Sequence, residues 1–188
     1  MREPRSRDSR PFDATIRLVE VPPSGGRAPL SQRGVELVRE GLARSRDIAC
    51  FDFVPSDYAV VYGELAALPR GSFCEWGSGI GIATGLAELL GFEAHGIEID
   101  AAMAAASRRL LADFGLSATV ETGDYLAIEH ASDVYFTYCW PGQMLRVERR
   151  FLESAPESAR LLICHGAGDV RCKVKQNEGL GPVVLGAT

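Results

Sequence analysis

The chain has 188 residues, 46% of them hydrophobic, and a net charge of -5 at pH 7. This size predicts one domain with a substantial core, and the charge argues against general nucleic-acid binding while leaving room for a local basic patch. The five cysteines form no C-x-x-C pair, and no His/Cys/Asp group has metal-ligand spacing, so we expect neither a disulfide framework nor a metal site. With no apolar signal core and no run of membrane-spanning length, the expected location is the cytoplasm, away from membranes.

The N-terminal segment differs in composition from the rest of the chain. Residues 1–30 are rich in Arg, Pro, Ser and Gly, which predicts a flexible arm and leaves residues 31–188 as a single domain. The apolar spacing in residues 31–45 then predicts a helix. Ser56 is expected to cap a second helix that runs to Leu68 and stops before Pro69.

Short apolar runs alternate with helical patterns through the remainder of the chain. Strands are predicted at 72–75, 94–99, 118–121, 134–139 and 160–165, and helices at 80–90, 101–114 and 143–154. This alternation predicts an α/β three-layer sandwich with a mostly parallel, doubly wound sheet. Residues 169–176 alternate apolar and basic side chains, which predicts a half-exposed strand with residues 182–185 as its candidate partner.

Three closely spaced glycines, Gly77, Gly79 and Gly81, separate the first of these strands from its helix. Glycine at this turn lets the backbone approach a nucleotide-type ligand. A dinucleotide site would have its third glycine where Ile82 stands, and Glu75 places a negative charge that repels a pyrophosphate but attracts an ammonium group. The pattern favours S-adenosylmethionine. Glu98, at the end of the next strand, is the expected acceptor for its ribose diol, although Glu98 alone would fit NAD equally well.

This arrangement resembles the class I methyltransferases, whose first motif is an acidic residue followed by G-x-G-x-G and whose second strand ends in Asp or Glu. The resemblance covers residues 58–165 and implies S-adenosylmethionine as the cofactor. It implies cofactor contacts from three loops, made by Glu75, Gly77, Ser78, Gly79, Gly81, Glu98, Ile99, Asp124 and Tyr125. For Asp124 the alternative is the capping of a turn. The helix that precedes the final hairpin in this family is missing from the pattern, so we expect a sheet shortened at its C-terminal edge.

The fourth predicted strand ends in Thr137-Tyr138-Cys139-Trp140-Pro141. Many amino-group methyltransferases carry Asn/Asp-Pro-Pro-aromatic at this place, and only the Pro and an aromatic residue remain here. Methyl transfer depends on alignment and a dry, electron-rich wall more than on acid–base chemistry. Tyr138 and Trp140 are therefore the candidate catalytic residues, with core packing as the alternative role of Trp140.

Several side chains keep two interpretations. The segment Tyr62-Gly63-Glu64 resembles one found before the cofactor loop of lysine methyltransferases without a SET domain, which implies that Glu64 helps to hold the methionine end. An ordinary exposed helix residue is the alternative. Tyr58 and Tyr62, one helical turn apart, either cover the pocket or pack in the core. His165 is a candidate base at a strand end or a structural histidine.

The sequence thus predicts an S-adenosylmethionine-dependent methyltransferase acting on an unidentified acceptor, which is either a protein side chain or a small molecule. The altered C-terminal region leaves room for a homodimer or another partner to complete the acceptor cleft. Two alternatives remain open at this point: an NAD(P)-binding oxidoreductase, and a protein that binds S-adenosylmethionine without catalysis.

Overall fold

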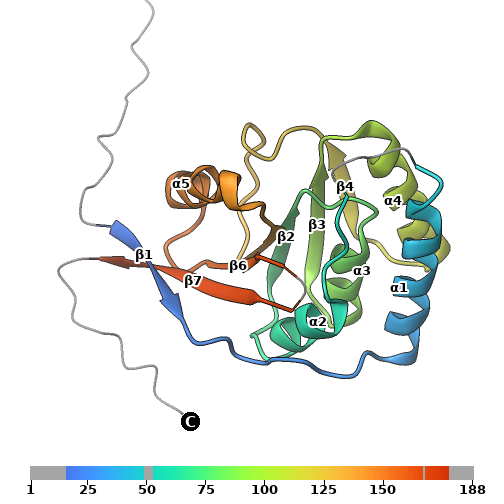
Figure 1. Ribbon diagram of the computed structural model, residues 1–188, viewed down its shortest axis with the longest axis horizontal. Coiled ribbons are helices and arrows are strands. Elements are labelled where there is room, and N and C mark those ends of the chain that lie inside the picture. Colours follow the sequence, from blue (N-terminus) through green and yellow to red (C-terminus); the bar gives the residue numbers. More distant parts are fainter. Residues whose placement is uncertain (1–15, 49–52, 167, 178–188) are drawn as a thin grey trace, which may run out of the picture.

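A computed structural model describes residues 16–48, 53–166 and 168–177 of the chain (Figure 1). The strands are β1 (Ile16–Val21), β2 (Ser72–Trp76), β3 (Glu93–Glu98), β4 (Thr119–Thr122), β5 (Val134–Tyr138), β6 (Arg160–Cys164) and β7 (Val170–Asn177). The helices are α1 (Gln32–Ser45), α2 (Tyr58–Ala66), α3 (Ile82–Leu89), α4 (Ala101–Asp113) and α5 (Met144–Ser154), with a short 3₁₀ turn at Pro141–Gln143 before α5.

The strands form one sheet in the order β1-β7-β6-β5-β2-β3-β4. Strands β2 to β6 pair in parallel, and β7 is antiparallel to both of its neighbours, so only β7 runs against the rest. The order reverses between β2 and β5, which makes the carboxyl ends of these strands the switch point of a doubly wound sheet. The predicted three-layer α/β fold is confirmed, and each strand predicted between residues 72 and 176 agrees with the structure to within one residue at either end.

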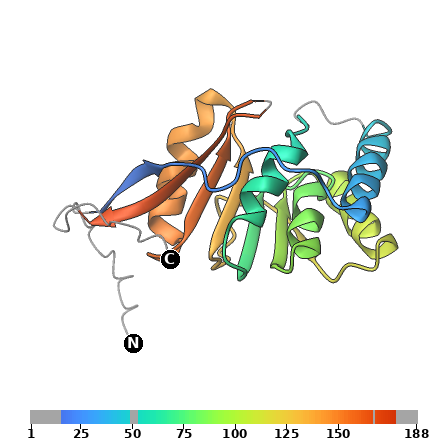
Figure 2. The same cartoon turned by 90° about the horizontal axis from the view of Figure 1, so that it is seen from below.

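Helices cover both faces of the sheet (Figure 2). Side chains of α2 and α3 pack against one face of β2 through Phe73, whereas α5 packs against the opposite face through Val147 and Phe151, next to Trp76. Successive strand residues point to opposite faces, so β2 directs Glu75 to the α3 side and Trp76 to the α5 side. Helix α1 packs outside this core against α3 and α4. None of the described helices combines the length and apolar character that a membrane crossing requires.

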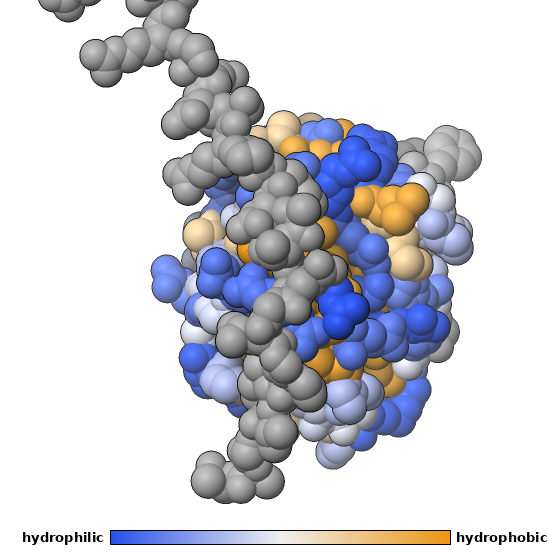
Figure 3. Space-filling model, turned by 90° about the vertical axis from the view of Figure 1, so that its left-hand side faces the viewer, coloured by the Kyte–Doolittle hydropathy of each residue, from blue (hydrophilic) through white to orange (hydrophobic). Residues whose placement is uncertain are grey.

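The N-terminal strand β1 forms the outer edge of the sheet. It pairs with β7 along its whole length, from Ile16 opposite Asn177 to Val21 opposite Cys172. The flexible arm predicted for residues 1–30 is therefore wrong from residue 16 onwards, while residues 1–15 and the candidate partner strand at 182–185 lie outside the described residues. The part of the surface that Figure 3 colours by hydropathy on this side of the molecule is mostly hydrophilic.

Glu64 fastens the segment after β1 to helix α2. Its carboxylate accepts hydrogen bonds from the backbone N–H groups of Ser24 (2.9 Å), Gly25 (3.2 Å) and Gly26 (2.5 Å). The two backbones touch, because a Cβ on Gly63 would meet the carbonyl oxygen of Gly26 at 1.7 Å. Glu64 is only 2% exposed, so the interpretation as an ordinary exposed helix residue is wrong.

Helix α2 begins one residue later than expected. Asp57, not Ser56, caps it, and the Asp57 carboxylate accepts a hydrogen bond from the Ala59 N–H at 3.2 Å. The same carboxylate pairs with Arg27, and the Ala28 N–H donates to the Ala59 carbonyl at 3.0 Å. The start of α2 is thus held by the segment that follows β1, and this leaves Ser56 on the cavity side of the helix start.

Candidate functional site

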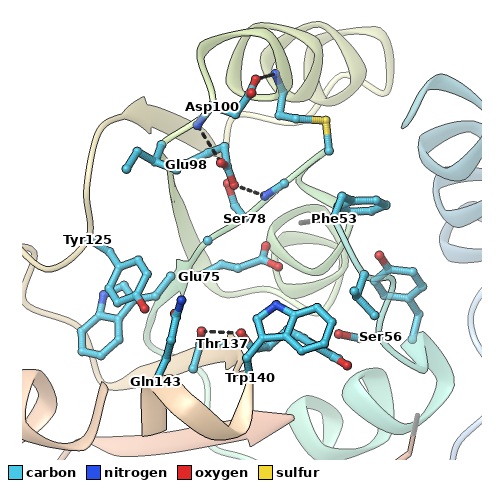
Figure 4. A pocket seen from close by; sticks show the side chains of 18 residues that line it. Phe53, Ser56, Glu75, Ser78, Glu98, Asp100, Tyr125, Thr137, Trp140 and Gln143 are labelled. Atoms are coloured by element: carbon cyan, nitrogen blue, oxygen red, sulfur yellow. Dashed lines mark hydrogen bonds between the residues drawn. The ribbon is translucent and has the colours of Figure 1, made fainter. Parts of the chain in front are cut away.

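A cavity of about 790 Å³ opens at the carboxyl ends of β2, β3 and β5 (Figure 4). Its volume falls in the range of about 300–1,000 Å³ that is usual for small-molecule sites, and its position is the one where doubly wound sheets bind ligands. The lining comprises aromatic, acidic and loop residues: Phe53, Val54, Ser56, Tyr58, Glu75, Trp76, Gly77, Ser78, Gly79, Glu98, Ile99, Asp100, Met103, Tyr125, Thr137, Tyr138, Trp140 and Gln143.

The glycine loop presents backbone to this cavity. Gly77 and Gly79 line it with φ angles of 74° and 53°. Residues other than glycine rarely adopt this left-handed backbone conformation. A Cβ on Gly77 would have no atom within 4 Å, so the backbone there faces open space. Gly81 has another role and does not line the cavity: it precedes α3 with a φ of 79°, and a Cβ there would meet the Ser107 hydroxyl at 2.0 Å.

Glu98 is a fixed acceptor at the end of β3. One carboxylate oxygen accepts the Gly79 N–H at 2.6 Å and the other accepts the Asp100 N–H at 2.8 Å (Figure 4). A carboxylate has about four lone-pair positions, so each oxygen keeps one for a ligand hydroxyl. The next residue, Ile99, also lines the cavity with 70% of its surface exposed. A bidentate acceptor therefore stands beside an apolar surface.

Glu75 is a buried carboxylate at the end of β2. It is 6% exposed and accepts hydrogen bonds from the Thr84 N–H (2.8 Å) and the Thr84 hydroxyl (2.5 Å). Burial raises the pKa of Glu75 to about 8, and the nearby charge of Glu98 adds to the rise, while the two bonds from Thr84 oppose it. A positively charged ligand group in the cavity would favour the ionised form of Glu75.

Aromatic side chains form the walls of the cavity. Tyr138 and Trp140 meet edge to face with ring centroids 5.8 Å apart, and Trp76 stacks on Tyr125 at 5.5 Å with an interplanar angle of 9°. Trp140 is 45% exposed, which places its ring at the rim of the cavity. Tyr58 joins the wall from α2, where burial raises its pKa.

Most of the sequence-predicted cofactor residues come together in this cavity, but five candidates lie outside its lining: Tyr62, Glu64, Gly81, Asp124 and His165. Asp124 is exposed, and its carboxylate accepts the Leu126 N–H at 2.8 Å, as in a capped turn, so its cofactor contact stays a prediction. Glu64 and His165 do not line the cavity either. Tyr62 packs in the core beside α1 and α3.

The sequence interpretation missed the segment before α2 and the residues that flank the known motifs. Phe53, Val54 and Ser56 come from a Phe-Val-Pro-Ser stretch. Its aromatic and proline content indicates a fixed loop, but it does not indicate which part of the fold the loop contacts. Asp100 and Gln143 follow Ile99 and Pro141 closely enough that their nearness to the site follows from chain connectivity. Among the described residues, no cluster of three or more His, Cys, Asp or Glu side chains is placed to hold a metal ion.

Neither a protein-family model nor a curated protein sequence matches the chain at a significant level. Solved structures do. An RNA methyltransferase from Salinibacter ruber in complex with S-adenosyl-L-homocysteine matches with a TM-score of 0.57 and 20% identity over 71% of this chain and 100% of its own. The S-adenosylhomocysteine-bound methyltransferase PaMTH1 from Podospora anserina matches with a TM-score of 0.57 and 14% identity over 73% of this chain and 63% of its own.

This chain has the class I methyltransferase fold. A methyltransferase from Geobacter sulfurreducens shares it, with a TM-score of 0.52 and 22% identity over 72% of this chain and 71% of its own. The aligned part of this chain covers 46% of PH0226 protein from Pyrococcus horikoshii, so it spans less than half the length of that neighbour.

Proposed function

We propose that the protein binds S-adenosylmethionine in this cavity and transfers its methyl group to an acceptor. The observation that carries the proposal is the pair of carboxylates at neighbouring strand ends. Glu98 offers a bidentate acceptor suited to a ribose diol, and Glu75 offers a carboxyl group that the methionine ammonium would ionise and then pair with. The solved structures of this fold that hold S-adenosylhomocysteine support the same ligand class.

The residues present fit this cofactor. Gly77 leaves the backbone open to the cavity, and Ile99 supplies an exposed apolar surface next to Glu98 for a flat ring. Ile82 stands where a dinucleotide site has its third glycine, and in its ionised form Glu75 would repel a pyrophosphate. The cavity chemistry therefore favours a ligand with a diol, a flat base and a cationic end.

When bound, the cofactor would supply a methyl group on a positively charged sulfur, and the acceptor's nucleophile would attack the methyl carbon in line as the carbon–sulfur bond breaks, with S-adenosylhomocysteine as the leaving group. The chain contributes alignment and exclusion of water. Tyr138 and Trp140 form an aromatic wall whose faces attract a cation by about 0.5–2 kcal/mol. The acceptor, a protein side chain or a small molecule, enters past the half-exposed Trp140.

The decisive experiment compares ligands on the purified protein. S-adenosylhomocysteine should raise the melting temperature, because it binds the folded state alone, whereas NADH at the same concentration should not. A larger shift with NADH would refute the proposal. Transfer of a labelled methyl group from S-adenosylmethionine into cell extract then separates an enzyme from a protein that only binds the cofactor, since the latter transfers no label.

A further inference from the structure

A second hollow, of about 260 Å³, lies between helix α5 and the loop after β4. Three arginines of α5 line it, together with one carboxylate and two leucines: Arg146, Arg149, Arg150, Glu153, Leu126 and Leu145. The arginines stand at positions i, i+3 and i+4 of the helix, so they share one face. In a chain with a net charge of -5, this is a concentrated basic surface.

The three guanidinium groups are not equivalent. Arg150 is committed to structure, because it donates to the Tyr125 carbonyl at 3.2 Å and to the Ile128 carbonyl at 2.6 Å. Among residues 16–48, 53–166 and 168–177, Arg146 and Arg149 form no hydrogen bond or ion pair, and both are exposed. Glu148, an acidic residue of the same helix, pairs with Lys173 and not with these arginines. Two guanidinium groups therefore remain available to a ligand.

The hollow adjoins the main cavity. Leu126 directly follows Tyr125, and Leu145 lies two residues after Gln143, both of which line the main cavity. The charge of Arg146 reaches Tyr125, where it partly offsets the rise in pKa that burial causes. A molecule that reaches past the rim of the main cavity would meet these arginines next.

We propose that the arginine hollow of α5 binds a phosphate group of the methyl acceptor. The assignment of this phosphate to the methyl acceptor rests on the proposed function. The presence of an anion site does not. A phosphate offers three oxygens that accept from two or three guanidinium groups at once, whereas a carboxylate satisfies one guanidinium fork. The volume falls below the range of about 300–1,000 Å³ typical of complete ligand sites, which fits one group of a larger molecule.

The apolar part of the hollow supports a nucleotide over a bare ion. Leu145 is 78% exposed, the most exposed of the large hydrophobic residues described, and it stands beside the arginines. An exposed leucine next to guanidinium groups suits the sugar or base that accompanies a phosphate. Trp140 lines the main cavity with 45% of its surface exposed, and its aromatic ring would let a base stack there.

The test measures binding of three probes to the full chain, with and without saturating S-adenosylhomocysteine: inorganic phosphate, uridine 5′-monophosphate and a labelled uridine hexanucleotide. Uridine avoids competition for an adenine site. Arg146→Gln/Arg149→Gln should weaken the nucleotide probes by roughly tenfold or more, because it removes two charge-assisted contacts. The same variant should leave affinity for S-adenosylhomocysteine unchanged.

The matched control is Arg39→Gln/Arg109→Gln, which removes the same charge from exposed positions on α1 and α4, far from α5 (Figure 1). It should change the affinity of the probes by less than about twofold at physiological salt. Equal losses in both variants, or no saturable binding of any probe to the unmodified protein, would overturn the proposal. Binding of inorganic phosphate alone would overturn the nucleotide assignment and indicate a simple anion. If S-adenosylhomocysteine fails to bind while the hexanucleotide binds normally, the proposed function fails and the arginine site stands.

Discussion

Thr84 holds one oxygen of Glu75 twice, through its backbone N–H at 2.8 Å and its hydroxyl at 2.5 Å. Thr84 belongs to the first turn of α3, so the unpaired N–H groups at this helix end favour the ionised carboxylate. Burial nevertheless dominates and raises the pKa of Glu75 to about 8. Near neutral pH the group is therefore poised to respond to a ligand.

Replacing Glu75 by Gln should change how stability depends on pH. Between about 4.5, the ordinary pKa, and about 8, the unfolded chain is ionised at Glu75 while the folded chain holds the proton. The folded state then binds more protons, so the wild type loses stability as pH rises through this window. The variant should gain stability relative to the wild type from pH 5 to pH 8 in urea unfolding. Glu93→Gln, at an exposed position, should show no such trend.

Binding of S-adenosylhomocysteine at pH 7 should release a proton. Its ammonium group favours the ionised form of Glu75, which is mostly protonated in the free protein at this pH. Calorimetry in two buffers with different ionisation enthalpies measures the release directly. It should disappear in Glu75→Gln, and identical enthalpies in both buffers for the wild type would contradict the assignment of Glu75.

Glu98→Gln should weaken binding of S-adenosylhomocysteine by about 1–3 kcal/mol, because the bond to the ribose diol loses its charge. The amide nitrogen of Gln is a donor and cannot accept, so the N–H of either Gly79 or Asp100 loses its partner. Titration calorimetry measures the affinity and urea unfolding the stability. Unchanged affinity in a folded variant would mean that Glu98 serves only the loop.

Trp140→Leu should lower methyl transfer while leaving affinity for the cofactor nearly intact, since the cofactor anchors lie on other loops. Trp140 is 45% exposed, so its loss should change the free energy of unfolding by less than about 1 kcal/mol. Val35→Ala, at a residue 52% exposed on α1, controls for the loss of surface hydrophobic area. A stable and fully active Trp140→Leu protein would exclude Trp140 from the reaction wall.

Glu64→Ala should destabilise the fold by about 1–3 kcal/mol or more, because the N–H groups of residues 24–26 lose their acceptor. Hydrogen exchange should rise in β1 before it rises in β3, since β1 is an edge strand that pairs with β7 alone among the described strands, whereas β3 pairs on both sides. Glu157→Ala, an exposed position, should have little effect. Equal stability of the Glu64 variant and its control would show that the fastening is redundant.

The parallel strands were predictable because each is a short apolar run between turn residues, and the glycine loop was predictable because its spacing is specific. Strand β1 was not, since its alternating Ile-Arg-Leu-Val-Glu-Val pattern sits among Pro, Ser and Gly. Strand β1 pairs with β7 at Val170–Asn177, and the local sequence around β1 does not indicate a partner so far along the chain.

The site residues divide along the same line. Glu75 stands two residues before Gly77 and Glu98 ends the next strand, so their places in the site follow from short-range spacing and strand order. Glu64 resembles any helix carboxylate in sequence, because its partners are backbone N–H groups of residues 24–26 that no side-chain pattern reveals. An Asp at position 124 is expected both for a capped turn and for a ligand contact, so the sequence does not distinguish the two roles. The structure contains the capped turn.

The pairing of β1 with β7 also sets the order of events during synthesis on the ribosome. Ile16 leaves the exit tunnel early, yet its partner Asn177 is among the last described residues to be made. At about 5–20 residues per second, β1 waits on the order of ten seconds or more without its neighbour. During that interval its unpaired backbone groups are open to other strands, so the nascent chain is at greatest risk of mispairing before the edge of the sheet closes.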